Sequence, residues 1–336
     1  MLATAEHPIG TVERLATHLV DVRDAPPDVF EDVSGVDWSA LDWTRLGRPY
    51  RVEKWARGKF DWEVTHGEPL PVKHGWELFN RSFQRLFDTD LPAAQSRALD
   101  GLGTAVGRLD LHAAREAATE LLQLAVWNRV HRVEDAVWDP RGKRALFGGL
   151  DVRAPRILFL GAADGYEGMQ LAAMYPGAQV VLVDYDAWCV EGRFGAFPER
   201  YPFLGADPAT GGARVWYRDE MDISFEVADI RDLRYGREFD VVLSVGLLEH
   251  FPDEHKPLAF ELHRRFLRPG GWAVMTTPRN QLRGRFFYDV MSDLMNFGYR
   301  ELMDVRQFGR YAWENGFDVV RAGIIKAHNG LLCRAR

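Results

Sequence analysis

The chain has 336 residues, 46% of them hydrophobic and 27% charged, which is typical of a globular protein long enough for two cores. Its formal net charge of −7 argues against a dedicated polyanion-binding surface, so we expect no nucleic-acid partner. The two cysteines, Cys189 and Cys333, have neither metal-ligand nor redox spacing, and we expect no metal and no disulfide framework. No apolar run approaches the ~20 residues that cross a bilayer, and the first residues lack the pattern of a secretion signal. We therefore expect a cytoplasmic protein without a membrane partner.

Residues 1–150 lack a regular alternation of strand and helix patterns and are rich in tryptophan. A helix is predicted over 75–87, and a second begins after Asp110, a suitable N-cap, and ends before Pro140. Residues 22–72 contain several proline turns and predict irregular structure. We expect a mainly helical N-terminal domain that helps to cover a substrate site, with its tryptophans in a core rather than a ligand pocket. These tryptophans are Trp38, Trp43, Trp55, Trp62, Trp76, Trp127 and Trp138.

Residues 151–336, which follow an expected junction at 139–149, alternate between apolar strand patterns and helical spacing. The predicted strands cover 157–160, 180–184, 223–228, 240–246 and 272–277, and the predicted helices cover 166–175, 187–197 and 256–267. Two last strands, 318–326 and 330–333, are separated by three residues, too few for a crossover helix, so they must pair antiparallel. This order predicts a doubly wound, mostly parallel α/β sheet with a C-terminal antiparallel hairpin.

Two segments exceed what such a sheet needs. Residues 199–220 contain Tyr-Pro, Asp-Pro and Gly-Gly and predict a long loop. Residues 278–304 are aromatic-rich and partly helical, and they follow a strand at the end where open α/β sheets bind ligands. That second segment is either a wall of an acceptor pocket or a surface helix packed on the core, and we favour the wall.

The most informative stretch runs from Ile157 to Gly168 and is followed by an apolar strand that ends at Asp184. Four apolar residues lead into Gly161, and a helix pattern opens after Gly165. A turn without bulky side chains lets backbone N–H groups approach a ligand at the positive end of a helix. Asp184 lies 23 residues after Gly161, close to the spacing at which a carboxylate accepts hydrogen bonds from a ribose. On these residues alone, a ligand site and a plain tight turn remain equal alternatives.

The downstream order favours the ligand site, because it resembles the class I methyltransferases that use S-adenosylmethionine (SAM). An acid, Asp229, follows the third strand, and Arg268-Pro-Gly-Gly271 precedes the fifth. The glycine turn, the acid that ends strand two, the acid after strand three and this last turn recur in that family in this order. The resemblance covers roughly residues 151–336 and implies a Rossmann-like fold, SAM as the cofactor and methyl transfer as the activity. The terminal hairpin also counts against a nicotinamide dehydrogenase.

The resemblance also implies the residues that hold the cofactor. Asp184 is expected to bind the ribose, Asp229 the adenine amino group, and Tyr185 to pack on the adenine face. The alternatives are a solvated acid for Asp184 and a helix N-cap for Asp229. The full predicted set is Gly161, Ala163, Asp164, Gly165, Tyr166, Asp184, Tyr185, Asp229, Ile230 and Ser244.

Two positions depart from the family pattern. The family usually has an acid where this chain has Phe159, and a glycine where it has Ala163. Alanine adds a methyl group and disfavours positive φ. The missing acid helps to hold the methionine end of SAM, and Asp164 and Glu167 are candidates to replace it.

Glu249 and His250 directly follow the fourth strand and are the candidate catalytic residues. A histidine of near-neutral pKa suits proton removal from a hydroxyl acceptor, although such a pair is also common as framework. We expect methyl transfer to a small molecule, with the acceptor atom and the oligomeric state undetermined. The alternatives are methylation of a protein or other macromolecule and a non-catalytic SAM-binding module. The loop after strand four lacks the Asn/Asp-Pro-Pro-aromatic signature of enzymes that methylate nucleic-acid amines.

Overall fold

The computed structural model of the protein describes residues 30–132, 140–325 and 327–336. The first residues, where we expect no secretion signal, lie outside these described residues. So do Trp138 and Asp139, the first residue of the expected junction. No helix within the described ranges is long and apolar enough to span a membrane.

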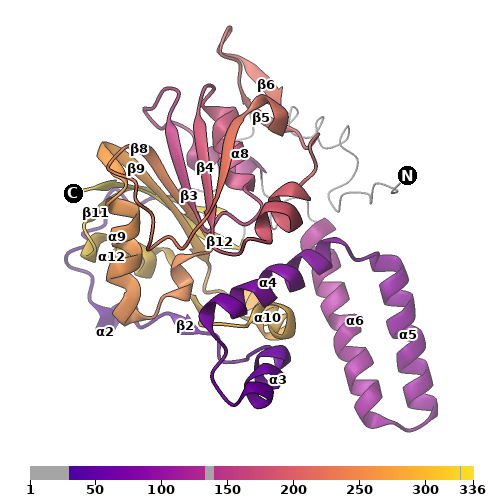
Figure 1. The fold of residues 1–336 in the computed structure, drawn as a ribbon. Helices are drawn as coiled ribbons and strands as arrows, with labels where there is room; N and C mark the ends of the chain where they lie inside the picture. Colours follow the sequence, from indigo (N-terminus) through magenta and orange to yellow (C-terminus); the bar gives the residue numbers. More distant parts are fainter. Residues whose placement is uncertain (1–29, 133–139, 326) are drawn as a thin grey trace.

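An eight-stranded mixed sheet forms the centre of the molecule, in the order β1-β11-β12-β9-β8-β3-β4-β7 (Figure 1). Its parallel strands are β3 (Arg156–Leu160), β4 (Gln179–Asp184), β7 (Asp222–Val227), β8 (Phe239–Val245) and β9 (Leu267–Pro278). Its antiparallel strands are β1 (Phe30–Glu31), β11 (Phe317–Ile325) and β12 (His328–Ala335). The predicted fold class, a doubly wound sheet with a C-terminal hairpin, is confirmed.

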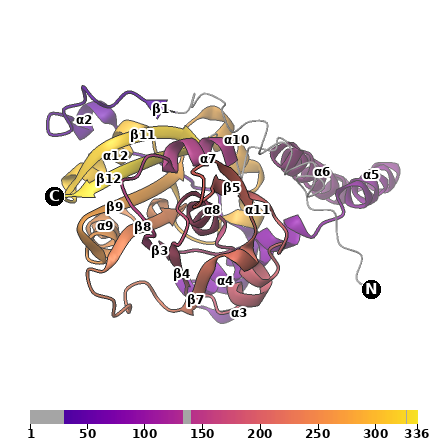
Figure 2. The same cartoon turned by 90° about the horizontal axis from the view of Figure 1, so that it is seen from above.

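Helices cover both faces of this sheet (Figure 2). Side chains of α9 (Lys256–Arg264) and α12 (Val305–Glu314) bury one face, where they pack on Leu158 and Leu160 of β3. Side chains of α7 (Pro140–Phe147) and α8 (Tyr166–Met174) bury the other face, against Ile157 and Phe159. The alternation along β3 is that of a strand buried on both faces, which explains the uninterrupted apolar run over residues 157–160.

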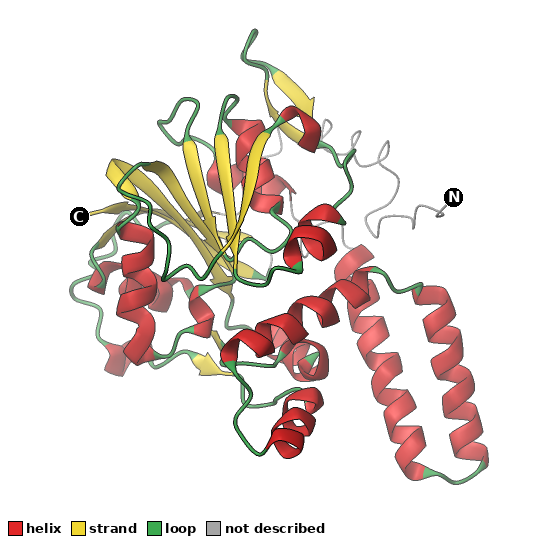
Figure 3. Ribbon diagram, in the orientation of Figure 1, coloured by secondary structure: helices red, strands yellow, loops and turns green. Residues whose placement is uncertain are grey.

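The segment before α7 is mainly helical, and its helices are α2 (Trp43–Leu46), α3 (Arg57–His66), α4 (Val72–Phe87), α5 (Leu91–Gly107) and α6 (Leu111–Arg132). The predicted helices correspond to α4 and α6, and Asp110 accepts a hydrogen bond from the backbone N–H of Ala113 at 3.0 Å, as an N-cap does. The prediction of irregular structure over 22–72 was wrong for α3, and α5 was not predicted. The hairpin of α5 and α6 projects away from the sheet (Figure 3).

This N-terminal segment is also joined to the rest of the chain by strand pairing. Strand β1 extends the sheet beside β11, and β2 (Tyr50–Arg51) pairs with β10 (Glu301–Leu302). Helix α7, which precedes the expected boundary at residue 150, packs on α8 and β11. A division into residues 1–150 and 151–336 therefore stays a prediction.

The two extra segments have regular structure. Residues 199–220, predicted as a long loop, contain the antiparallel hairpin β5 (Phe203–Ala206) and β6 (Ala213–Trp216). Trp216 and Phe203 pack with Tyr166 in a small aromatic core, which anchors this hairpin on α8. Residues 278–304 form α10 (Leu282–Val290), α11 (Ser292–Met295) and β10, in agreement with the partly helical prediction. The helix predicted over 187–197 is a π-helix over Val190–Gly195.

Candidate cofactor and acceptor site

The turn between β3 and α8 has the geometry of a cofactor-binding turn. Gly161, Ala163 and Gly165 have φ values of +69°, +48° and +78°. A Cβ atom at Gly165 would lie 2.6 Å from Leu182 Cδ1, so only glycine fits there. Ala163 adopts a left-handed conformation at the position where a glycine is expected, and this conformation costs an alanine ~1–2 kcal/mol of free energy. The departure at Ala163 thus leaves the shape of the turn intact, and its backbone fits the approach of a cofactor.

Asp184 lies at the carboxyl end of β4, directly beside this turn. Its Oδ2 accepts a hydrogen bond from the backbone N–H of Ala163 and its Oδ1 accepts one from that of Asp186, both at 3.1 Å. Burial raises the pKa of Asp184, and the two backbone donors oppose that rise. Each oxygen keeps a second lone pair, so the carboxylate can still accept bonds from ribose hydroxyls.

The residues predicted for the adenine follow β4 and β7 at the same edge. Asp229 accepts hydrogen bonds at 2.9 Å from the side chain and the backbone of Arg231, and the side-chain bond lowers its pKa. Tyr185 is partly buried, and Lys73 of α4 lies 6.0 Å from its ring centroid. Ile230 is partly buried against the core. The structure brings these residues to one edge, and their contacts with the adenine stay a prediction.

Two other predicted cofactor residues direct their side chains elsewhere. The Tyr166 side chain is fully buried in the aromatic core below the β5–β6 hairpin, and only its backbone belongs to the turn. Ser244 is fully buried, and its hydroxyl is hydrogen-bonded to Nε2 of His263 on α9 at 2.8 Å. Any contact of these two residues with SAM must therefore involve backbone atoms.

A buried polar cluster that no sequence pattern predicts connects α4 to the glycine turn. Arg193 is 5% exposed, and its guanidinium donates to Asp164 Oδ2 at 3.1 Å and to Asn80 Oδ1 at 3.3 Å. Asn80 in turn donates to Asp186 Oδ2 at 3.1 Å. These residues are far apart in the sequence, and no local sequence motif indicates that they are in contact. The cluster holds α4 over the edge where Asp184 lies.

Glu249 and His250 lie just beyond β8, in a short 3-10 helix. Glu249 is 2% exposed, its Oε2 has no hydrogen-bond partner among the described residues, and burial raises its pKa to about 7. His250 Nδ1 lies 2.7 Å from the carbonyl oxygen of Tyr299, and its Nε2 lies 3.6 Å from Glu249 Oε1. Burial lowers the pKa of His250 well below its usual value, so at neutral pH the ring is uncharged and Nδ1 donates to the carbonyl. The ring of Trp76 on α4 contacts this imidazole edge-on, with 4.4 Å between centroids.

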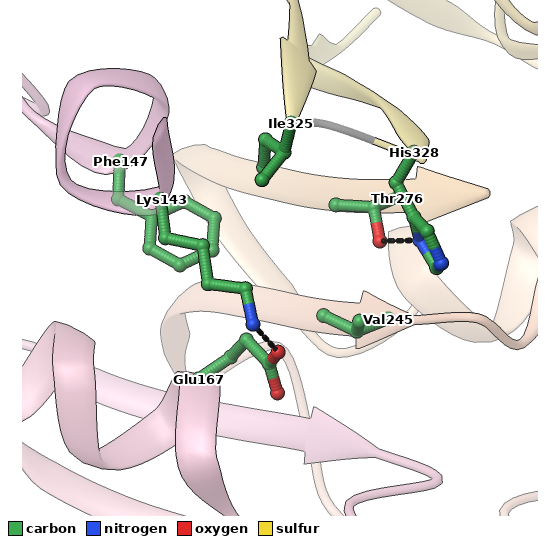
Figure 4. A pocket seen from close by; sticks show the side chains of 7 residues that line it. All are labelled: Lys143, Phe147, Glu167, Val245, Thr276, Ile325 and His328. Atoms are coloured by element: carbon green, nitrogen blue, oxygen red, sulfur yellow. Dashed lines mark hydrogen bonds and ion pairs between the residues drawn. The ribbon is translucent and has the colours of Figure 1, made fainter. Parts of the chain in front are cut away.

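A cavity of about 30 Å³ lies at the same edge of the sheet, between α7 and α8 (Figure 4). Glu167 forms a buried ion pair with Lys143 on one side of it, and His328 Nδ1 lies 3.2 Å from Thr276 Oγ1 on the other. Burial, followed by the charge of Lys143, lowers the pKa of His328 to about 3. The cavity is lined by Lys143, Phe147, Glu167, Val245, Thr276, Ile325 and His328. Among the described residues, no group of three or more His, Cys, Asp or Glu side chains is placed to hold a metal ion.

Comparison with known proteins identifies the family. Residues 111–322, more than half of the chain, match the methyltransferase domain family. Solved structures similar to this chain include human N-acetylserotonin methyltransferase in complex with SAM (15% identity, TM-score 0.44, 70% of this chain and 59% of that one). The 1,6-didemethyltoxoflavin-N1-methyltransferase of Burkholderia thailandensis is also similar (15% identity, TM-score 0.40, 66% of this chain and 89% of that one). A third is a possible exported protein of Bordetella parapertussis (17% identity, TM-score 0.46, 81% of this chain and 98% of that one).

No curated protein matches the sequence. The chain covers 59% of the length of the human enzyme. The family match agrees with the order of elements around the glycine turn, and it confirms both the predicted family and the predicted cofactor. The chain belongs to the methyltransferase domain family.

Proposed function

We propose that this protein transfers the methyl group of SAM to a small molecule that binds in an enclosed site beyond the end of β8. The enclosure carries this proposal. Trp76 of α4 covers His250, and the guanidinium of Arg300 lies 5.6 Å from the Phe79 ring on α4 and 4.6 Å from the Tyr288 ring on α10. A site covered by helices from two segments suits a small acceptor better than a folded macromolecule.

A hydrophobic cluster supports the same conclusion. It connects α4, α6, α10 and α11, so the N-terminal helices and the segment between β9 and α12 form one packed cover. Its buried members are Val52, Leu86, Trp127, Tyr288, Met291, Met295 and Leu302. This packing agrees with a substrate-covering N-terminal segment and with the 278–304 segment as an acceptor wall, both of which remain proposals.

SAM supplies an electrophilic methyl group on a sulfonium, and its transfer is an in-line displacement. The protein must therefore position the acceptor, exclude water and remove a proton where the acceptor is a neutral hydroxyl. We propose that Glu249 takes this proton rather than His250. A carboxyl of pKa about 7 with an unpartnered Oε2 is poised near neutral pH, whereas burial makes His250 a weak base.

Asp184 provides the test of the cofactor site. Replacing Asp184 by alanine removes charge-assisted hydrogen bonds worth ~1.5–3 kcal/mol, which weakens SAM binding roughly 10- to 150-fold. Isothermal titration calorimetry with SAM and S-adenosylhomocysteine (SAH) measures this loss. The matched control is Asp222→Ala. Asp222 lies at the amino end of the neighbouring strand β7, and its exposed carboxylate accepts a hydrogen bond from Gln179. Equal affinities in the wild type and in Asp184→Ala would refute this assignment.

The acceptor class is tested with SAM that carries an isotopically labelled methyl group. The wild-type protein is incubated with pooled phenols, amines and carboxylic acids, and in parallel with protein and RNA extracts. We expect label in the small-molecule fraction, with less label when Glu249 is replaced by glutamine. Label confined to the protein or RNA fraction would contradict the proposal and favour a macromolecular acceptor.

A further inference from the structure

The cavity between α7 and α8 is adjacent to the cofactor turn. Glu167 lies two residues after Gly165, in the first turn of α8, and Val245 is the last residue of β8. Strand β8 is two strands away from β4 in the sheet, roughly 10 Å at the usual strand spacing. A ligand that places its ribose at Asp184 and extends across the end of β3 therefore reaches this cavity.

The cavity is too small for a whole cofactor. Its volume of about 30 Å³ is roughly twice the room that one water molecule needs, which suits a few heavy atoms at the end of a ligand. Its walls are partly apolar, with Phe147, Val245 and Ile325, and the charges on it are concentrated at one pair.

That pair is the ion pair of Lys143 and Glu167. Their side chains are only 5% and 9% exposed, and Lys143 Nζ also lies 4.3 Å from the ring centroid of Tyr166. The free-energy cost of dehydrating two opposite charges often exceeds the gain from their mutual attraction. Such a pair at a cavity therefore points to a role in binding. An α-amino acid group carries one ammonium and one carboxylate. It can therefore give each protein charge a further partner of opposite sign without adding net charge.

We infer that this cavity binds the amino-acid end of SAM, with Glu167 accepting hydrogen bonds from its ammonium group and Lys143 donating to its carboxylate. The inference rests on the proposed function only in that the cofactor must bind at the turn. Phe159, where the family usually has an acid, is 1% exposed and packs in the same core as Phe147, so β3 offers no carboxylate at this position. Of the two candidate replacements, Asp164 is engaged by Arg193, whereas Glu167 lines the cavity.

The position of His328 connects this cavity to the acceptor side. A Cβ atom at Gly246, directly after β8, would lie 3.3 Å from Glu249 Oε1 and 3.8 Å from His328 Cε1. Glu249 and the cavity therefore flank the same residue. Gly246 would therefore lie between an amino-acid group held by Lys143 and Glu167 and an acceptor at Glu249.

The test compares two ligands that differ only at the amino-acid end. SAH carries the amino-acid group, and 5′-methylthioadenosine has the same adenosine and sulfur without it. Calorimetry gives both dissociation constants for the wild type, for Lys143→Met, for Glu167→Gln and for the double variant. The double variant removes both charges of the pair together, so neither is left without the other, and it keeps the test valid if a single variant does not fold. Arg214→Met, on the exposed β5–β6 hairpin, is the control.

We expect the wild type to prefer SAH by at least about tenfold, and the double variant to show less than about threefold preference. Binding of 5′-methylthioadenosine should change by less than about twofold, because the adenosine site is untouched. A folded double variant that keeps the full preference for SAH would overturn the inference. A raised acceptor KM with unchanged SAH binding would also overturn it and assign the cavity to the acceptor. If the wild type binds neither ligand, the cofactor assignment itself fails.

Discussion

Replacing Glu249 by glutamine should change the free energy of unfolding by an amount that depends on pH. The difference between the variant and the wild type should shift in favour of the variant as the pH rises from 5 to 8. Burial raises the pKa of this carboxyl from 4.5 to about 7 in the folded protein, while the unfolded chain titrates near 4.5. The folded state therefore binds the proton more tightly than the unfolded state does. The stability that comes from this proton is complete below pH 4.5 and is lost as the pH rises through 7.

The size of the loss follows from the two pKa values. At 1.36 kcal/mol per pKa unit, ionising Glu249 in place costs about 3 kcal/mol of unfolding free energy by pH 8. The glutamine variant carries no charge at any pH and escapes this cost. The difference in unfolding free energy between variant and wild type should thus grow by about 2–3 kcal/mol between pH 5 and pH 8, because a small part of the loss has already occurred by pH 5.

Urea denaturation followed by tryptophan fluorescence at pH 5, 6, 7 and 8 measures this difference. Glu254→Gln, at an exposed glutamate in the same loop, is the matched control and should give a difference that does not change with pH. A difference that is equally flat for Glu249→Gln would show that the carboxyl titrates normally, and the argument for Glu249 as a base would fall with it. Methyl transfer by Glu249→Gln should drop at least tenfold for a neutral hydroxyl acceptor.

Two further substitutions test the cofactor edge. Ala163→Gly should raise the unfolding free energy by up to about 1 kcal/mol, because relief of the left-handed conformation outweighs the entropy that glycine adds to the unfolded chain. Ala154→Gly, at φ +41° and away from the turn, should gain similarly, and the absence of any gain at Ala163 would contradict strain in the turn. Arg193→Met should cost about 3–5 kcal/mol in denaturation and weaken SAH binding, since Asp164 loses its buried partner. Arg214→Met should stay within about 0.5 kcal/mol, and an Arg193→Met result that small would refute the buried cluster as a support of the site.

The parts of this fold that the sequence predicts are those specified by local patterns. Strand β3 is buried on both faces over residues 157–160, so these four residues are all apolar and stand out against the glycine turn that follows. The hairpin of β11 and β12 is predicted by the short connection alone, because no helix fits between the strands. Asp184 and Gly161 could be placed together because each lies at the carboxyl end of a parallel strand.

The remaining features depend on contacts between distant residues. The bond from Asn80 to Asp186 spans 106 positions, and that from Lys143 to Glu167 crosses from α7 to α8. Helix α5 was not predicted, although it has an Asp90 cap whose carboxylate accepts from the Ala93 N–H at 3.1 Å. Its three glycines lower the helix propensity that a single-sequence pattern relies on, and its packing with α6 offsets that loss.

The two departures from the family pattern have different physical consequences. At Ala163 the backbone keeps the left-handed conformation, so the substitution adds strain to the turn and leaves its geometry unchanged. At Phe159 an acid is replaced by a core side chain, so a negative charge disappears from the sheet and must come from elsewhere if the cofactor is zwitterionic. In our proposal, Glu167 supplies that charge from the next helix, and Lys143, its ion-pair partner on α7, balances it. Ligand binding depends on the charge and position of a side chain and not on which element carries it. An acid that is missing from one strand is therefore no evidence of lost activity where a neighbouring helix places an acid at the same edge of the sheet.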